Sequence, residues 1–172
     1  MESALGGQGV WAVSGTAEHR AAAQPIVVQV CKFRIMAADQ STEATRALGR
    51  SLVDTFGRGW ATCDMSLLMT VYAPNAVFIE TPFTAPIQGT DAIRGYWNEV
   101  PYNQSEITFS SGEIYAAGPW FSTEFKCVFR RRRTGESVEA RGAIFCETEA
   151  GRITEMRMYW HRWNGGRETS IA

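Results

Sequence analysis

Apolar residues recur at two different spacings along the chain. After Ser41 or Thr42 they recur every four positions, which is the spacing of one helix face. The residues that share this face are Leu48, Leu52, Phe56 and Trp60. A second, shorter helix is predicted over residues 65–72. From residue 120 on, apolar and polar residues alternate, which is the period of a strand with one buried face.

The stretch 72–97 links the two patterns and carries the first candidate for chemistry. Pro74 ends the helix before it, because a proline cannot continue a helix. Residues 76–80 form a β-branched and aromatic run that predicts a strand, and a carboxylate, Glu80, ends that run. A loop follows, and residues 92–97 predict a further helix that ends with an aromatic pair.

The remainder of the chain predicts four strands joined by turns. Gly118-Pro119 and Ala150-Gly151 stand between strands, and both dipeptides favour turns. The predicted strands are residues 106–116, 120–131, 136–148 and 152–163. Helices that precede a series of adjacent strands favour an α+β fold with a curved antiparallel sheet, and no parallel pair is needed.

The composition supports one domain and narrows the function classes. The chain has 172 residues, of which 45% are hydrophobic, enough for one core. Its net charge of −1 argues against nucleic acid or an anionic membrane as a partner. The arginine run 130–133 falls at a predicted hairpin tip, where charged side chains stay in water. No apolar run approaches the ~18 residues that a membrane helix needs.

The cysteines favour a reduced, cytoplasmic protein. Cys31, Cys63, Cys127 and Cys146 form no CxxC pair, and no histidine lies near them at a zinc spacing. We therefore expect free thiols, no metal and no cofactor. His161 is expected at an interface or rim, or alternatively as an acid or base at the mouth of a pocket.

The first 40 residues differ from the rest of the chain. Residues 1–24 are rich in Gly, Ala, Ser and Gln without a helical or strand period, and residues 26–35 could form one extra strand. We expect residues 1–40 to be a leader that is disordered or loosely attached. The domain itself is then 41–165, followed by a tail at 166–172.

Two motifs carry a family resemblance. The first is met by Tyr72, Ala73, Asn75, Ala76, Glu80, Pro82 and the run 89–97, and the second by residues 151–161. Together they resemble the SnoaL-like branch of the nuclear transport factor 2-like superfamily, which also holds ketosteroid isomerase, limonene epoxide hydrolase and scytalone dehydratase. The resemblance implies a sheet that curls around the helices into a cone with one open end and an apolar pocket.

Alternation assigns the inner face of one long strand and leaves two others open. The inner residues of the strand 120–131 are Phe121, Thr123, Phe125, Cys127 and Phe129. On the strands 136–148 and 152–163 both faces carry apolar groups, so polarity alone does not decide between them.

The resemblance to ketosteroid isomerase implies an answer for the last strand. It places Met156, Met158 and Trp160 inward, and Arg157, Tyr159 and His161 outward. Ile144, Cys146 and Tyr159 would then be exposed, at ~25 cal/mol per Å² of apolar surface left in water. A homodimer through the outer sheet face, which the family often uses, would cover them.

The predicted inner wall is aromatic and rich in sulfur, which suits a small, flat, hydrophobic molecule. The alternative is that these side chains simply fill the core. The predicted pocket residues are Phe56, Trp60, Tyr72, Phe78, Phe83, Trp97, Phe121, Phe125, Arg141, Phe145, Met156, Met158 and Trp160.

Glu80 is the candidate catalytic residue. The resemblance places the base of ketosteroid isomerase on Glu80 or on Thr81, depending on the alignment, and Glu80 is the one with acid–base chemistry. Burial in an apolar cone disfavours a charged carboxylate, which suits proton transfer near neutral pH. Alternatively, Glu80 is exposed at the strand end or is paired with Arg94 or Arg141.

The hydrogen-bond donors of ketosteroid isomerase fall on Phe56 and Ala143, which cannot donate. We therefore do not expect steroid isomerisation by that mechanism. The sequence predicts a cofactor-independent isomerase, dehydratase or cyclase that acts on a compact hydrophobic substrate with Glu80 as acid or base. The alternative is a non-catalytic module that binds a hydrophobic ligand or dimerises as an accessory protein.

Overall fold

The computed structural model describes residues 24–163, and side-chain environments from residue 41 on. By their contacts the residues divide after Ala37 into two compact units. The helix α1, Gln24–Ala61, crosses this boundary, so the extra strand predicted at 26–35 is wrong. A helix satisfies its own backbone hydrogen bonds, whereas a strand there would need a partner strand. The separate leader at 1–40 stays a prediction, and residues 1–23 and the tail lie outside the described residues.

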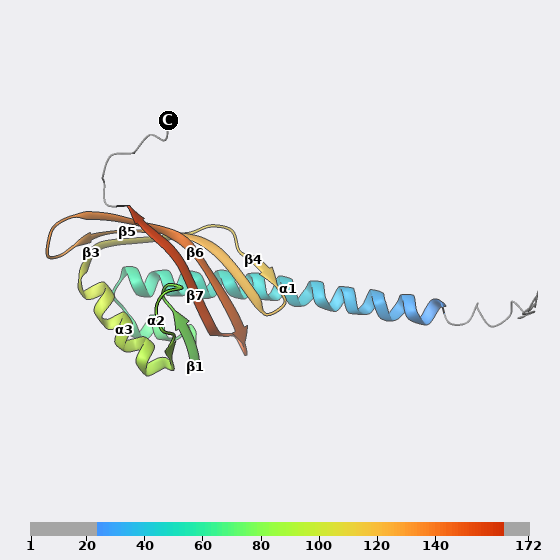
Figure 1. Ribbon diagram of the computed structural model, residues 1–172. Coiled ribbons are helices and arrows are strands. Elements are labelled where there is room, and N and C mark those ends of the chain that lie inside the picture. Colours follow the sequence, from blue (N-terminus) through green and yellow to red (C-terminus); the bar gives the residue numbers. More distant parts are fainter. Residues whose placement is uncertain (1–23, 164–172) are drawn as a thin grey trace, which may run out of the picture. The chain divides into compact units, whose positions relative to one another are not determined.

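The unit that begins at Ala38 has helices first and strands afterwards, as an α+β fold requires (Figure 1). After α1 come α2 (Met65–Met69), β1 (Tyr72–Ile79), β2 (Ile87–Gln88), α3 (Thr90–Tyr102), β3 (Gln104–Ser111), β4 (Tyr115–Ala117), β5 (Trp120–Arg131), β6 (Ser137–Glu149) and β7 (Arg152–Trp163). The bounds of β5 and β7 are those predicted from the sequence. No described helix is long and apolar enough to cross a bilayer.

The strands form one sheet in the order β2-β1-β7-β6-β5-β3, with β4 also beside β5. The pair β1–β7 is parallel, with Phe78 opposite Met156, so the sheet is mixed and the expectation of a purely antiparallel sheet is wrong. Hairpin connections force β5, β6 and β7 to be antiparallel, but β1 and β7 are joined through α3 and the whole meander, which leaves their direction free. In Figure 1 the long strands curve over the helices of this unit.

The first short helix and strand differ from the prediction in their bounds. The helix predicted over 65–72 ends at Met69, and Tyr72 already begins β1. Pro74 therefore lies in a strand, at a register shift between Tyr72 and Val77. A bulge of this kind tolerates proline, because the ladder hydrogen bond is already missing there.

The predicted helix face of α1 is confirmed as part of the core. Leu52, Phe56 and Trp60 are buried, and Leu48 packs against them. Phe56 lies at the centre of an aromatic cluster, edge-on to Trp60, Trp97 and Phe109. This cluster fixes α1 against α3 and the sheet.

The inner faces of β5 and β7 are also as predicted, but that of β6 is not. Ile144 and Cys146 are fully buried, whereas Phe145 is 42% exposed and Arg141 is exposed. In the register of β6 and β7, Ile144 lies opposite Met158 and Cys146 opposite Met156. Directly opposite residues share a face of the sheet, so inward methionines require Ile144 and Cys146 to point inward as well.

Gly142 allows β6 and β7 to pair closely at Trp160, its cross-strand partner. A Cβ atom on residue 142 would lie 2.0 Å from the Tyr159 carbonyl oxygen and 2.7 Å from the Trp160 Cα. Both are backbone atoms, so β7 itself would have to move. We expect Gly142→Ala to lower the free energy of unfolding by about 2 kcal/mol, measured by urea denaturation.

Gly95→Ala is the matched control. Gly95 is exposed on α3, and an added Cβ there would have no atom within 4 Å. An alanine in a helix loses less entropy on folding than a glycine, so this variant should gain ~0.5–1 kcal/mol. A Gly142→Ala protein as stable as the wild type would contradict the close approach.

Candidate functional site

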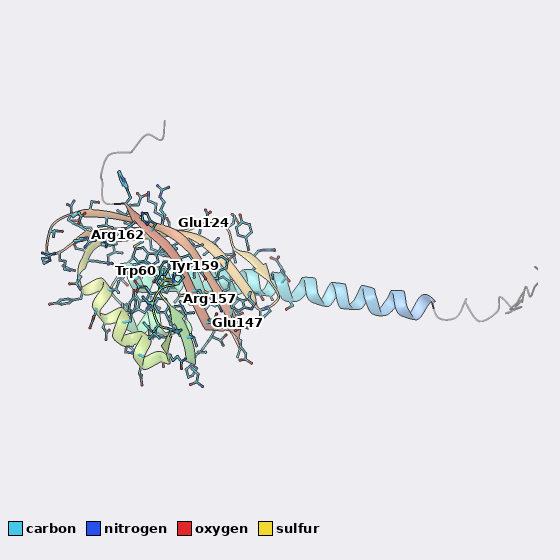
Figure 2. The ribbon with its side chains drawn as sticks, viewed as in Figure 1. Trp60, Glu124, Glu147, Arg157, Tyr159 and Arg162 are labelled. Carbon is cyan, nitrogen blue, oxygen red and sulfur yellow. The ribbon has the colours of Figure 1, made fainter. Side chains whose placement is uncertain are left out.

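A cavity of about 270 Å³ lies between the helices and the inner face of the sheet. Its walls come from α1, α3, the residue after β1, and the strands β3, β5, β6 and β7. Six of the residues predicted from the sequence line it: Trp60, Glu80, Trp97, Phe125, Met158 and Trp160. Figure 2 labels Trp60 beneath the sheet and Arg162 toward the end where β5 turns into β6.

The other predicted pocket residues lie elsewhere. Five are buried in the core without lining the cavity: Phe56, Tyr72, Phe78, Phe121 and Met156. These five side chains therefore fill the core, which was the alternative to lining a pocket. Phe83 is 95% exposed in the loop after β1, and Arg141 and Phe145 lie on the outer face of β6, so their prediction as inner-wall residues is wrong.

Glu80 follows β1 directly and is half-buried. The indole Nε1 of Trp160 donates a hydrogen bond to the Glu80 carbonyl oxygen at 3.2 Å, which fixes the chain after β1 against β7. Among the described side chains, none forms an ion pair with Glu80, and Arg141 pairs instead with Glu139. The proposed pairing of Glu80 with Arg141 is therefore not found.

Tyr96 on α3 is the side chain that accompanies Glu80. It lines the same cavity and is half-buried. Burial raises the pKa of the Tyr96 phenol, and the charge of Glu80 and a hydrogen bond to its side chain raise it further. The phenol therefore stays protonated and can donate to the carboxylate. The cavity combines a carboxyl group and a hydroxyl donor within a mostly apolar wall.

A second polar contact lies in the wall of the cavity. The Trp60 indole Nε1 donates to the Gln104 side-chain oxygen at 3.0 Å, and both residues are buried. This bond satisfies the Trp60 indole and orients the Gln104 amide. Trp60 is therefore available to a ligand through its ring face.

Sequence reasoning missed nine lining residues: Tyr96, Val100, Asn103, Gln104, Phe129, Arg131, Val138, Ala140 and Arg162. Helical spacing could have indicated Tyr96 and Val100, which lie four residues apart on α3. Phe129 continues the inner alternation of β5, so the same alternation indicates it as a lining residue.

The described residues offer little other chemistry. No group of three or more His, Cys, Asp and Glu side chains among residues 41–163 could hold a metal ion. Burial raises the pKa of the Cys127 thiol to about 12 and that of Cys146 well above its ordinary value, so both stay protonated. His161 is exposed on the outer side of β7, as predicted.

Comparison with solved structures places this arrangement in a known fold. A putative isomerase from Bacillus subtilis superposes with a TM-score of 0.62 at 23% identity, over 68% of this chain and 88% of that one. The epoxide hydrolase/cyclase-like enzyme SalBIII has a role in pyran ring formation in the polyether salinomycin. It superposes with a TM-score of 0.60 at 19% identity, over 70% of this chain and 94% of that one.

A third neighbour, RV0760c from Mycobacterium tuberculosis, was solved in complex with estradiol-17beta-hemisuccinate. It superposes with a TM-score of 0.57 at 18% identity, over 66% of this chain and 94% of that one. At these identities the likeness shows the fold alone. No curated protein matches the chain in sequence. The family model of the SnoaL-like domain matches residues 53–156, most of the described unit, and the chain therefore belongs to the SnoaL-like family.

Proposed function

We propose that the cavity binds a compact hydrophobic molecule, and that Glu80 transfers a proton in a cofactor-independent isomerisation, dehydration or cyclisation. The observation that carries the proposal is the Glu80 side chain in a mostly apolar cavity with the Tyr96 hydroxyl beside it. A positioned carboxylate can take a proton from a C–H or O–H group and return it elsewhere on the substrate.

The size and wall of the cavity favour a compact substrate. Its volume of about 270 Å³ lies just below the ~300–1,000 Å³ of usual ligand sites. Trp160 and Phe125 offer ring faces, and Met158 is an adaptable contact. The neighbour solved with a steroid ester, and the neighbour that acts in ring formation, support a hydrophobic substrate for this fold.

The arrangement also separates this chain from ketosteroid isomerase. The oxyanion positions of that enzyme fall on Phe56, which is buried in the aromatic cluster, and on Ala143, whose strand partner is Tyr159 on the outer face. Neither can stabilise a dienolate oxygen. Tyr96 supplies the hydroxyl donor of the proposed site, from a different element of the fold.

Binding tests the proposal before any activity is known. We expect cyclohexenone, styrene oxide or estradiol, added in turn to ¹⁵N-labelled protein, to shift the indole N–H signal of Trp160, assigned with Trp160→Phe. That indole borders the cavity and is bonded to the backbone at Glu80. If none of the three compounds moves the signal, or all move only residues outside the cavity, the proposed site is wrong.

A second candidate function is a dimerising module, favoured by a hydrophobic patch on the outer sheet face. We define the outer-face patch as Trp120, Phe145, Arg157 and Tyr159. Phe145 and Tyr159 pack edge-on with ring centres 5.7 Å apart, and the Arg157 guanidinium lies 5.9 Å from the Trp120 ring. Ile144 and Cys146 are buried on the inner side, so they give no reason to expect a homodimer. The outer-face patch is the reason instead.

We expect light scattering to give twice the chain mass of 19.1 kDa at micromolar concentration. Tyr159→Glu should shift the mass to that of a monomer, because it buries a charge in the outer-face patch. Tyr102→Glu is the control, since Tyr102 is 79% exposed on α3, away from the patch. A wild-type mass near 19.1 kDa would rule out the dimer.

A further inference from the structure

We infer that the ligand of the cavity is a hydrophobic carboxylic acid, whose carboxylate binds at Arg162 and Arg131 at the cavity mouth. This inference rests on the proposed function, because it names the class of molecule that would occupy the same cavity. Two observations support it: the positions of the two arginines in the sheet, and the small part of their charge that acidic side chains of the protein neutralise.

The two arginines lie at the same end of the sheet. β5 and β7 are both antiparallel to β6, so they run in the same direction and end at the same edge. Arg131 is the last residue of β5, and Arg162 is the last but one of β7. Both line the cavity, with β6 between them, so their strands are roughly 10 Å apart. Cys127 is the β5 residue level with Arg162, so Arg131 also lies four residues, roughly 13 Å, further along the sheet.

The side chains of β6 between them are small. Ala140 lies opposite Arg162, and Val138 lies next to it on the inner face. These residues leave the space in front of β6 open, and both line the cavity. A carboxylate placed there can accept hydrogen bonds from a guanidinium group, which fits its geometry in a two-bond fork.

The charge at this end is only partly neutralised within the protein. Arg131 Nε lies 3.1 Å from Glu136 Oε2. Arg162 is exposed, and among residues 41–163 no acid lies within ion-pair distance of it. The adjoining hollow carries Arg132 and Arg133 beside Asn103, a residue that it shares with the cavity. The mouth is therefore positive although the whole chain has a net charge of −1, and such a mouth attracts anions.

The position of Glu80 fits a carboxylate at Arg162. Trp160 is bonded to the backbone of Glu80, and Arg162 is two residues further along β7, roughly 7 Å away. A ligand anchored at Arg162 would hold its carboxylate apart from the Glu80 carboxyl group. Its apolar body would then lie along Trp160 and Met158, with the reacting atom several bonds from the acid group.

A matched pair of probes tests this inference. 2-Naphthoate and 2-naphthamide have the same rings and nearly the same size, but only the first carries a charge at neutral pH. We expect calorimetric titration of the full chain to give about tenfold tighter binding of the naphthoate, ~1.4 kcal/mol. Arg162→Gln should reduce this preference to about twofold and leave naphthamide binding unchanged, because the apolar contacts remain.

Two further variants make the result specific to this residue. Arg162→Lys keeps a cation and should keep most of the preference, which a purely structural role would not explain. Arg152→Gln removes the same charge from the first residue of β7, where the side chain is exposed and does not line the cavity, and should keep the full preference. If Arg152→Gln lost the preference for naphthoate to the same extent as Arg162→Gln, the assignment of the carboxylate site to Arg162 would be overturned.

The outcomes separate the inference from the proposed function. If naphthoate and naphthamide bind equally well and both shift the Trp160 indole signal, the carboxylate inference is wrong and the hydrophobic site stands. If neither compound binds, both proposals fail together. Tighter naphthoate binding that disappears in Arg162→Gln and persists in Arg162→Lys supports the inference.

Discussion

Phe56→Ala is expected to lower the free energy of unfolding by ~3–5 kcal/mol. Phe56 is fully buried, and its ring lies edge-on to Trp97 at 5.2 Å, Phe109 at 5.8 Å and Trp60 at 5.9 Å between ring centres. Its removal would leave a cavity surrounded by large rings that cannot collapse into it. Urea denaturation monitored by far-UV circular dichroism measures the loss.

Phe83→Ala is the control for this prediction. Phe83 is 95% exposed, so its removal should change the free energy of unfolding by less than about 0.5 kcal/mol. Both phenylalanines were predicted as pocket residues from the sequence, and the structure gives them opposite environments. If Phe56→Ala were as stable as the wild type, the aromatic cluster would not be part of the core.

The elements that the sequence predicts well are those with a strong period. The four-residue spacing of Leu52, Phe56 and Trp60 can be satisfied only by a helix with one buried face. The polar and apolar alternation of β5 likewise assigns Phe121 and Phe125 to the core. In both cases one residue type marks one face, so local sequence is sufficient.

β6 shows why other faces could not be predicted. Apolar residues occur on both of its sides, Ile144 on one and Phe145 on the other, and a shift of one residue exchanges them. Pairing with β7 decides which of the two faces of β6 points inward, because Cys146 lies opposite Met156. That register depends on the whole sheet, and no local pattern along β6 contains it.

The candidate site divides in the same way. Glu80 could be found because a carboxylate stands at the end of an apolar strand. Gln104 and Arg162 could not, because they meet the cavity from different strands, and their convergence follows from the packing of the helices against the sheet. Loop residues such as Phe83 have no period at all, so an apolar side chain there carries no information about its direction.

Glu80→Gln is expected to lower kcat by about 10²–10⁴-fold for any substrate that the chain converts. Glutamine has the same shape and can still accept a hydrogen bond from the Tyr96 hydroxyl, but it cannot take up a proton. The fold and the binding of ligand should therefore survive, with KM nearly unchanged. Steady-state kinetics on a turned-over compound, together with the melting temperature of the variant, separates loss of chemistry from loss of structure.

Two variants make this result interpretable. Glu99→Gln removes a carboxylate from an exposed position on the same helix as Tyr96 and should keep full activity. Tyr96→Phe removes only the hydroxyl donor and should lower kcat by about tenfold, since one hydrogen bond of this kind contributes ~0.5–1.5 kcal/mol. An unchanged kcat in Glu80→Gln would remove the acid–base role. A cavity that still binds 2-naphthamide in that variant would then identify the chain as a binding module, because the apolar wall and the Trp160 contact do not depend on proton transfer.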